Sequence, residues 1–158
     1  MAEKIKIIRN PNADSRTAID NITQKELHEA SISHINDVKN VLTFLANILK
    51  ENGKKHDWTK IAFENEFFKD FKELKAGNEF IKGTWYQRHI TEEKHHPFNN
   101  CHEDINLLDI IETIVDCVCS GKTRSGHIDN IEFKPEVLAE AVNNTIRLVD
   151  KITEVKNK

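Results

Sequence analysis

The sequence lacks several features that would place it at once in a well-marked class of protein. Its five glycines form no Gly-rich phosphate-binding loop of the P-loop type. No apolar run is long enough to cross a bilayer, and the first residues lack the long apolar core of a signal peptide. The net charge of −3 predicts no strongly basic face, which disfavours duplex DNA as a partner. We therefore expect a cytoplasmic protein that binds neither membranes nor duplex nucleic acid.

Cysteine is also scarce, whereas histidine is abundant. The three cysteines are an odd number, and Cys117 and Cys119 are too close for an ordinary disulfide, which favours a reducing compartment. Of the eight histidines, six fall between His34 and His102. A concentration of this kind directs attention to the middle of the chain.

Apolar residues recur at helical spacing through most of the 158 residues. We predict an all-α fold, a compact single-domain bundle of about five main helices. Residues 1–22 are predicted as a poorly defined N-terminal arm, in which Ile5, Ile7 and Ile8 form either a short strand or part of the arm. Residues 23–158 are predicted as the helical domain.

Helix boundaries follow from capping and stop signals. Thr23-Gln24-Lys25-Glu26 is a capping box that predicts a helix start, with its stop at Asn52-Gly53. His34 extends the apolar stripe of this helix, so we expect its side chain to point inward. A helix from about residue 104 to 119 is apolar around nearly all its circumference, which predicts burial.

The end of the chain is predicted from glycine and proline. Gly121 is expected to end the apolar helix, and residues 121–133 are expected to form a polar loop. Pro135 suits the first position of a last helix that runs to about residue 155.

Three acidic residues interrupt the apolar helix. Asp109, Glu112 and Asp116 are spaced by three and four residues and share one face. Carboxylates on a buried face repel one another and are costly to desolvate. Lysine or arginine partners, a face open to water, or a metal ion with neutral histidine ligands would each offset that cost.

The histidines of the middle region suit a metal ion. Each has a simpler explanation by itself: a core histidine with a satisfied partner, a chance His-Asp dipeptide, or a surface His-His pair. Imidazole nitrogen and carboxylate oxygen together suit divalent Mn, Fe, Co, Ni or Zn, and the lack of thiolates argues against a structural zinc finger. We predict one or two divalent metal ions. The predicted ligands are His34, His56, Asp57, His95, His96 and Asp116.

The order of these residues resembles the HD-domain phosphohydrolase superfamily, whose all-helical members carry metal ligands in the order His, His-Asp, Asp. More narrowly, residues 34–116 are similar to a group of small uncharacterised proteins common in bacteriophages and bacteria. Their shared segments are His-Asp-x-[Ser/Thr]-Lys, here His56-Asp57-Trp58-Thr59-Lys60, then His-His-Pro, here His95-His96-Pro97, and a Glu-x-x-x-Asp pair, here Glu112 and Asp116. The resemblance covers a little over half of the chain.

The resemblance implies a metal-dependent phosphohydrolase that acts on a nucleotide or another small phosphate ester, in the host cytoplasm if a phage encodes it. Histidines between the dipeptide and the last Asp mark members of the superfamily with two metals. His89, His95 or His96 would therefore hold a second metal or donate protons to the leaving group. Glu112, and Asp109 on the same face, would orient a ligating histidine.

One position departs from the superfamily pattern. Many members have a glutamate three residues after the Asp, which positions the attacking water, and this chain has Lys60 there. Glu64, one helical turn further on, is the candidate substitute. Candidate phosphate contacts, which are also ordinary surface charges, are Lys60, Arg88, Lys94 and Arg124.

Two other functions compete with hydrolysis. The first is a non-catalytic phage accessory protein that binds a host protein or a nucleotide and retains the metal. The second is a helical interaction module without metal, in which the acidic stripe faces water or basic side chains. The sequence leaves the oligomeric state open, a homo-oligomer included.

Overall fold

The computed structural model describes residues 4–13, 17–74 and 79–156. The predicted all-α class is confirmed, since five longer helices and one of five residues dominate these ranges. Their bounds are α1 (Gln24–Lys55), α2 (Trp58–Ala62), α3 (Glu64–Leu74), α4 (Thr84–Glu92), α5 (Leu107–Ser125) and α6 (Pro135–Ile152). The 3-10 turns are Pro11–Ala13 and Phe80–Lys82, and the strands are β1 (Ile5–Ile8) and β2 (Thr153–Lys156). None of the helices in these ranges has the length and apolar character of a membrane span.

The chain forms two units. The first contains residues 1–48 and 146–158, and the second contains residues 49–145. Helices α1 and α6 each contribute to both units, because each crosses one of these boundaries.

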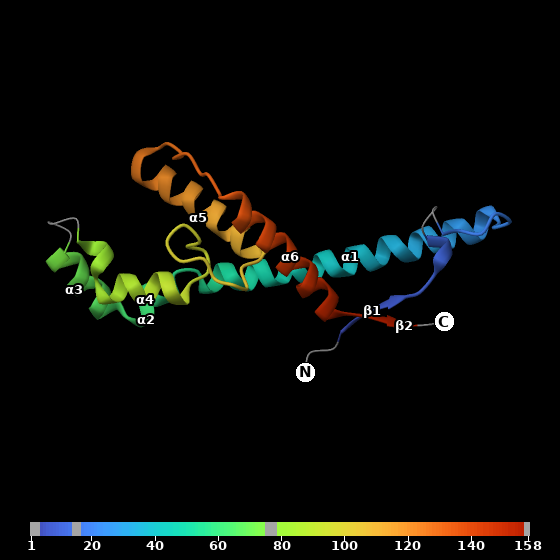
Figure 1. Cartoon of the computed structure of the whole chain (residues 1–158), viewed down its shortest axis with the longest axis horizontal. Helices are drawn as coiled ribbons and strands as arrows, with labels where there is room; N and C mark the ends of the chain where they lie inside the picture. The colour runs from blue at the N-terminus through green and yellow to red at the C-terminus, as the bar shows by residue number, and fades with distance from the viewer. Residues whose placement is uncertain (1–3, 14–16, 75–78, 157–158) are drawn as a thin grey trace. The chain divides into compact units, whose positions relative to one another are not determined.

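A two-stranded parallel sheet joins the ends of the chain in the first unit. β1 pairs with β2 in a register that sets Ile5 beside Thr153, and Figure 1 shows the two strands side by side. Of the two alternatives for the isoleucines near the N-terminus, the strand is therefore the one found. The predicted helix to residue 155 is wrong, because the chain leaves α6 after Ile152 and pairs with β1 instead.

The capping box at the start of α1 is confirmed. The Thr23 amide donates to Glu26 Oε2 at 2.9 Å, and the Glu26 amide donates to Thr23 Oγ1 at 3.3 Å. The predicted inward position of His34 is wrong, since its side chain is exposed. Its stripe neighbour Val38 is itself 44% exposed, so the apolar stripe is not buried at this end of α1. The helix also continues past Gly53 to Lys55.

The core of the second unit lies where α5 meets the first turns of α6. Its fully buried members are Ile105, Ile110 and Ala141, and Phe133 and Val137 pack against them. α5 begins with a capping box in which Asn106 Oδ1 accepts the Leu108 amide hydrogen. The helix is buried on only one side, contrary to prediction.

Two glycines shape the end of α5. The prediction that Gly121 ends the helix is wrong, since the helix runs on to Ser125. A Cβ on Gly121 would lie 2.7 Å from the His127 carbonyl oxygen, so this glycine permits the following loop to approach the helix. The helix ends instead at Gly126, whose φ of 77° is the left-handed conformation that glycine adopts without strain.

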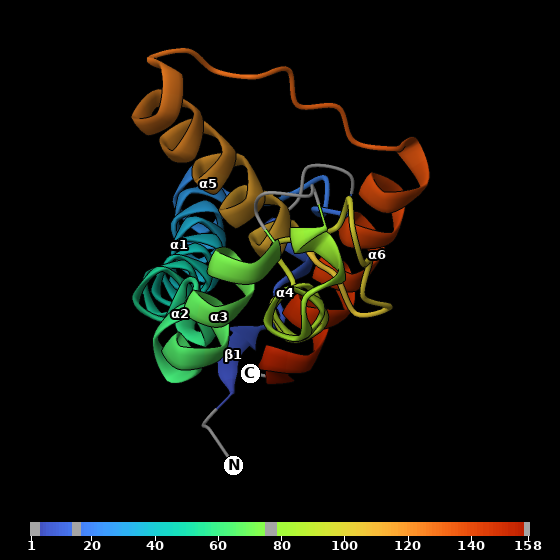
Figure 2. The same cartoon turned by 90° about the vertical axis from the view of Figure 1, so that its left-hand side faces the viewer.

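Helices α2, α3 and α4 pack together in the second unit, and Figure 2 shows them as close neighbours. Trp85 of α4 is buried, stacks on His89 with ring centroids 4.7 Å apart, and donates from Nε1 to the Thr59 carbonyl oxygen at 3.1 Å. The buried Asp70 accepts the Trp85 amide hydrogen at 2.8 Å. A Cβ on Gly83 would lie 2.2 Å from Asp70 Oδ2, so any other residue there would displace the Asp70 carboxylate. These contacts fix the position of His89.

Candidate metal centre

Four residues of the second unit bring one ligand atom each within 4.8 Å of one another: Asp57, His89, His95 and His96. His89 lies on α4, the other two histidines follow that helix, and Asp57 precedes α2. The structure therefore joins four of the residues that the sequence singled out, including His89, which was predicted as a second-metal ligand or proton donor.

Glu93, the residue after α4, holds the loop that carries Asp57. Its Oε2 accepts the Asp57 amide hydrogen at 2.9 Å, and its Oε1 accepts the Thr59 amide hydrogen at 3.0 Å. Asp57 has a φ of 57°, a left-handed conformation that aspartate tolerates better than most residues. The buried glutamate thus fixes the direction in which the Asp57 carboxylate points.

The hydrogen bonds around His89 determine which of its nitrogens is free. Thr59 Oγ1 donates its only proton to Glu93 Oε1 at 2.6 Å. It must therefore accept a hydrogen from His89 Nδ1, which lies 2.7 Å away. These contacts place a proton on His89 Nδ1, so Nε2 is the ring nitrogen through which His89 could bind a cation.

His95 and His56 are oriented in the same way by Glu112. His56 Nδ1 lies 3.1 Å from Glu112 Oε1, and His95 Nδ1 lies 3.4 Å from the same oxygen. His95 Nδ1 also lies 3.6 Å from Glu93 Oε2. The carboxylates of Glu112 and Glu93 therefore face the Nδ1 atoms of these histidines, and the Nε2 atoms point away from these two carboxylates.

The Nε2 atoms converge on Asp57. Those of His89 and His95 lie 3.5 and 3.7 Å from Asp57 Oδ1, and those of His89 and His96 are 2.7 Å apart. Metal–nitrogen bonds of ~2.0–2.1 Å in a tetrahedral site give ligand atoms about 3.3 Å apart. The two distances to Asp57 Oδ1 are close to this value, whereas the 2.7 Å between His89 and His96 is that of a hydrogen bond between the two rings. His95 Nε2 is buried and has no hydrogen-bond partner among the described residues, so it is a candidate ligand atom for a cation.

The charge of the region also suits a cation. The carboxylates of Asp57, Glu93, Glu112 and Asp116 all contact its imidazoles. Within the described ranges, Lys60 is the only lysine or arginine that forms an ion pair with any of them, through Asp57 Oδ2. A divalent ion would offset the remaining negative charge.

The pKa values follow from these contacts. Hydrogen bonds with Asp116 and Glu112 raise the pKa of His56 to about 10. Burial by itself would raise the pKa of Asp57, but the neighbouring His95 and Lys60 side chains hold it well below its usual range. Burial and the neighbouring His95 and His89 lower the pKa of His96 to about 4, so it is neutral at pH 7 and able to bind a cation.

A second group lies beside the first and shares His95 with it. Its members are His56, His95 and Glu112. His56 Nε2 also lies 3.4 Å from Asp116 Oδ1 and 3.6 Å from Asp57 Oδ2. The predicted ligands His56 and Asp116 therefore contact each other next to the four-residue group.

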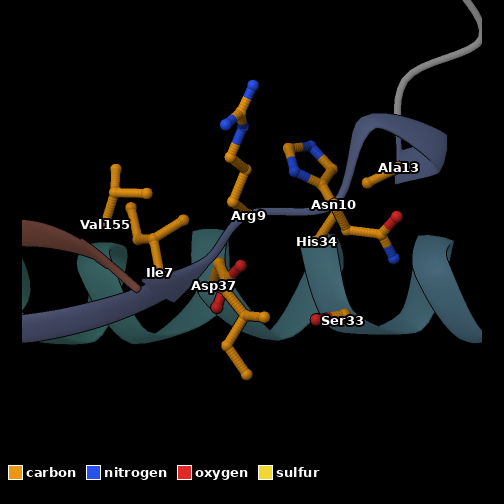
Figure 3. Close-up of a pocket in the computed structure, with 9 residues that line it drawn as sticks. Ile7, Arg9, Asn10, Ala13, Ser33, His34, Asp37 and Val155 are labelled. Atoms are coloured by element: carbon orange, nitrogen blue, oxygen red, sulfur yellow. The ribbon is translucent and has the colours of Figure 1, made fainter. Parts of the chain in front are cut away.

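Three predicted site residues are not members of either group of possible metal ligands. His34 belongs to the first unit, where Figure 3 shows it with Arg9 and Asn10 at a pocket of about 350 Å³. Asp109 accepts hydrogen bonds from the Asn106 amide and side chain in the capping box of α5. Glu64, the candidate for water positioning, is exposed at the start of α3.

The four candidate phosphate contacts each pair with a carboxylate. Lys60 pairs with Asp57, and Lys94 pairs with Asp104. Arg88 Nη2 lies 3.3 Å from Glu66 Oε2, and Arg124 Nη2 lies 2.5 Å from Asp129 Oδ2. Only the Lys60 partner belongs to the candidate metal centre.

Sequence reasoning missed Glu93 and Thr59. A signal for Glu93 was present, because it follows His89 by four residues and the two side chains share one helix face. Thr59 stood inside the His-Asp-x-[Ser/Thr]-Lys segment, but its role depends on the fully buried position that only the fold supplies.

Comparisons with known proteins add no assignment. No protein-family model, no curated protein and no solved structure matches this chain.

Proposed function

We propose that this chain is a metal-dependent hydrolase of small phosphate esters, nucleotides included, in which Asp57, His89, His95 and His96 hold the metal. The observation that carries the proposal is the approach of the histidine Nε2 atoms to one another and to Asp57 Oδ1. Orientation of the Nδ1 atoms of His89 and His95 by Thr59, Glu93 and Glu112 supports it. Ligating histidines are commonly held through the second ring nitrogen in this way.

A bound divalent ion lowers the pKa of water and neutralises phosphoryl oxygens. The chain itself positions the reacting groups. Glu93 and Thr59 fix His89, and Glu112 fixes both His95 and His56. His56, with Nε2 beside Asp116 Oδ1, is placed to hold a proton for the leaving oxygen.

The test uses protein purified without a histidine tag. We expect elemental analysis to find a divalent metal, and we expect phosphate release from a panel of phosphate esters that a chelator abolishes. His95→Ala should lose both metal and activity, whereas His127→Ala, which alters an exposed histidine outside both groups, should lose neither. Metal content near zero that does not rise on addition of Mn or Ni would refute the proposal.

The role of His56 is tested separately. If His56 holds the proton for the leaving oxygen, His56→Gln retains the metal and loses most phosphate release. If it is a ligand, as its place in the His-Asp dipeptide predicts, the same variant loses metal as well. Elemental analysis of that variant beside its activity distinguishes the two roles.

A second candidate function is a non-catalytic protein that retains the metal. It is favoured by the position of Glu64, which lies with Asn65 and Phe67 at another pocket and not among the metal-binding group. Bound metal without phosphate release from any ester of the panel would support this function over hydrolysis.

A further inference from the structure

A cavity of about 320 Å³ opens beside the candidate metal centre, at the lower end of the range of about 300–1,000 Å³ for ligand pockets. Its polar residues are His56, Glu112 and Asp116. Its other lining residues are Leu49, Gly53, Ile111, Val115 and Cys119. His56 connects the cavity with the metal centre, because its Nε2 lies 3.6 Å from Asp57 Oδ2.

The apolar wall of the cavity comes from one stripe of α5. Ile111, Val115 and Cys119 follow one another at intervals of four residues, so they share a helix face next to Glu112 and Asp116. Ile111 is 43% exposed and Val115 is 54% exposed. Apolar side chains that line an open cavity in this way offer a surface to an apolar ligand.

Gly53 lines the cavity from α1 and adds no side chain to it. It lies inside α1, where glycine is less favourable than alanine by roughly 0.5–1 kcal/mol. A Cβ at this position would meet nothing within 4 Å, so the backbone does not require a glycine. A larger side chain at residue 53, which lines the cavity, is therefore expected to occupy space inside it.

The cavity offers no unpaired positive charge to a polyphosphate, because its one cationic side chain, His56, already pairs with Glu112 and Asp116. No lysine or arginine is among its lining residues in the described chain, and two of these residues are carboxylates. A ligand with several negative charges would be repelled by Glu112 and Asp116. A ligand could place an anionic group only at the metal, whose positive charge would neutralise it.

We infer that this cavity selects the substrate: it binds the apolar body of a small monoester, an aryl or branched alkyl phosphate, whose single anionic head lies at the metal. The inference rests on the proposed hydrolase function for the identity of the head group. The part that does not depend on that function is the preference of the cavity for an apolar ligand body, which Leu49, Ile111 and Val115 would contact.

The experiment measures binding, by calorimetry, of matched ligands to the full chain loaded with Mn²⁺. Phenylphosphonate is compared with methylphosphonate, and benzohydroxamate is compared with acetohydroxamate, since hydroxamates bind metals without imitating a phosphate ester. We expect each phenyl ligand to bind at least about tenfold more tightly than its methyl partner. Gly53→Leu should reduce that ratio to near one without changing metal content, and Gly53→Ala should preserve it.

Cys119→Trp, which narrows the cavity from α5, provides a second variant should Gly53→Leu not fold. Equal affinities for phenyl and methyl ligands under both head groups would overturn the inference, as would a phenyl preference that both filled variants retain. A phenyl preference seen only with hydroxamates would support the cavity and contradict the phosphate-ester function. The two failures are therefore distinguishable.

Discussion

Histidines occupy two different settings in this molecule. In the second unit, His89 and His95 are 3% and 4% exposed, and Glu93 lies near Nδ1 of each. In the first unit, His34 is exposed, and Asp37, the carboxylate at the same pocket, is not buried. For His89 and His95, a buried acceptor behind the ring is therefore a better mark of a candidate ligand than the spacing of a histidine along a helix.

Two alanine substitutions, one in each setting, test this comparison with the largest expected effect. His95→Ala removes a residue common to both candidate metal-binding groups, so we expect metal affinity to fall by more than about 100-fold. His34→Ala should leave affinity unchanged. Competition with a chromogenic chelator measures both. Loss of metal in His34→Ala, with retention in His95→Ala, would show that the HD-like ligand order describes the site better than the present geometry.

Removal of the metal should have the next largest effect. An ion present at one hundred times its dissociation constant stabilises the folded chain by about 2.7 kcal/mol. For a chain of this length that corresponds to a rise in Tm of roughly 5–10 °C. We expect this rise on addition of Mn²⁺ to chelator-treated protein, measured by thermal unfolding. His34→Ala should show it in full, and a comparable rise in His95→Ala would place the ion elsewhere.

Much of the helical fold was predictable because local signals determine it. The capping box of Thr23 and Glu26 and the start of α6 at Pro135 are properties of a few neighbouring residues. The end of α6 was not predictable in this way, because β2 exists only through its pairing with β1, some 150 residues distant in sequence. Gly121 misled for a different reason: it permits the close approach of the loop at His127, and the course of that loop is not set by the glycine itself.

The candidate site was predictable in composition but not in arrangement. Residue types and order were sufficient to choose Asp57, His95 and His96, which the structure brings together. The acidic stripe was only partly informative: Glu112 and Asp116 contact His56, whereas Asp109 turns to the capping box. Which carboxylate faces an imidazole and which caps a helix depends on contacts with other elements.

Glu93→Gln sharpens the comparison by testing the buried acceptor itself. The carboxylate accepts hydrogen bonds from the amides of Asp57 and Thr59, and the substitution replaces one oxygen by an amide donor. We expect metal affinity to fall about 10- to 100-fold. Glu92→Gln, one residue earlier and exposed, is the matched control and should have no effect. Equal affinities in the two variants would mean that the acceptor does not orient the ligands.

The smallest expected effect concerns Lys60, which stands where the HD superfamily pattern has glutamate. Its ammonium pairs with Asp57 Oδ2 while Asp57 Oδ1 faces His89 and His95, so lysine and metal compete for one carboxylate. Lys60→Met should therefore raise metal affinity by a few-fold, measured by chelator competition. Lys82→Met removes an ion pair of the same sequence spacing, with Glu79, and should change nothing. A fall in affinity in Lys60→Met would instead show that Lys60 positions Asp57, because the carboxylate would then need the ammonium to hold its other oxygen toward the histidines.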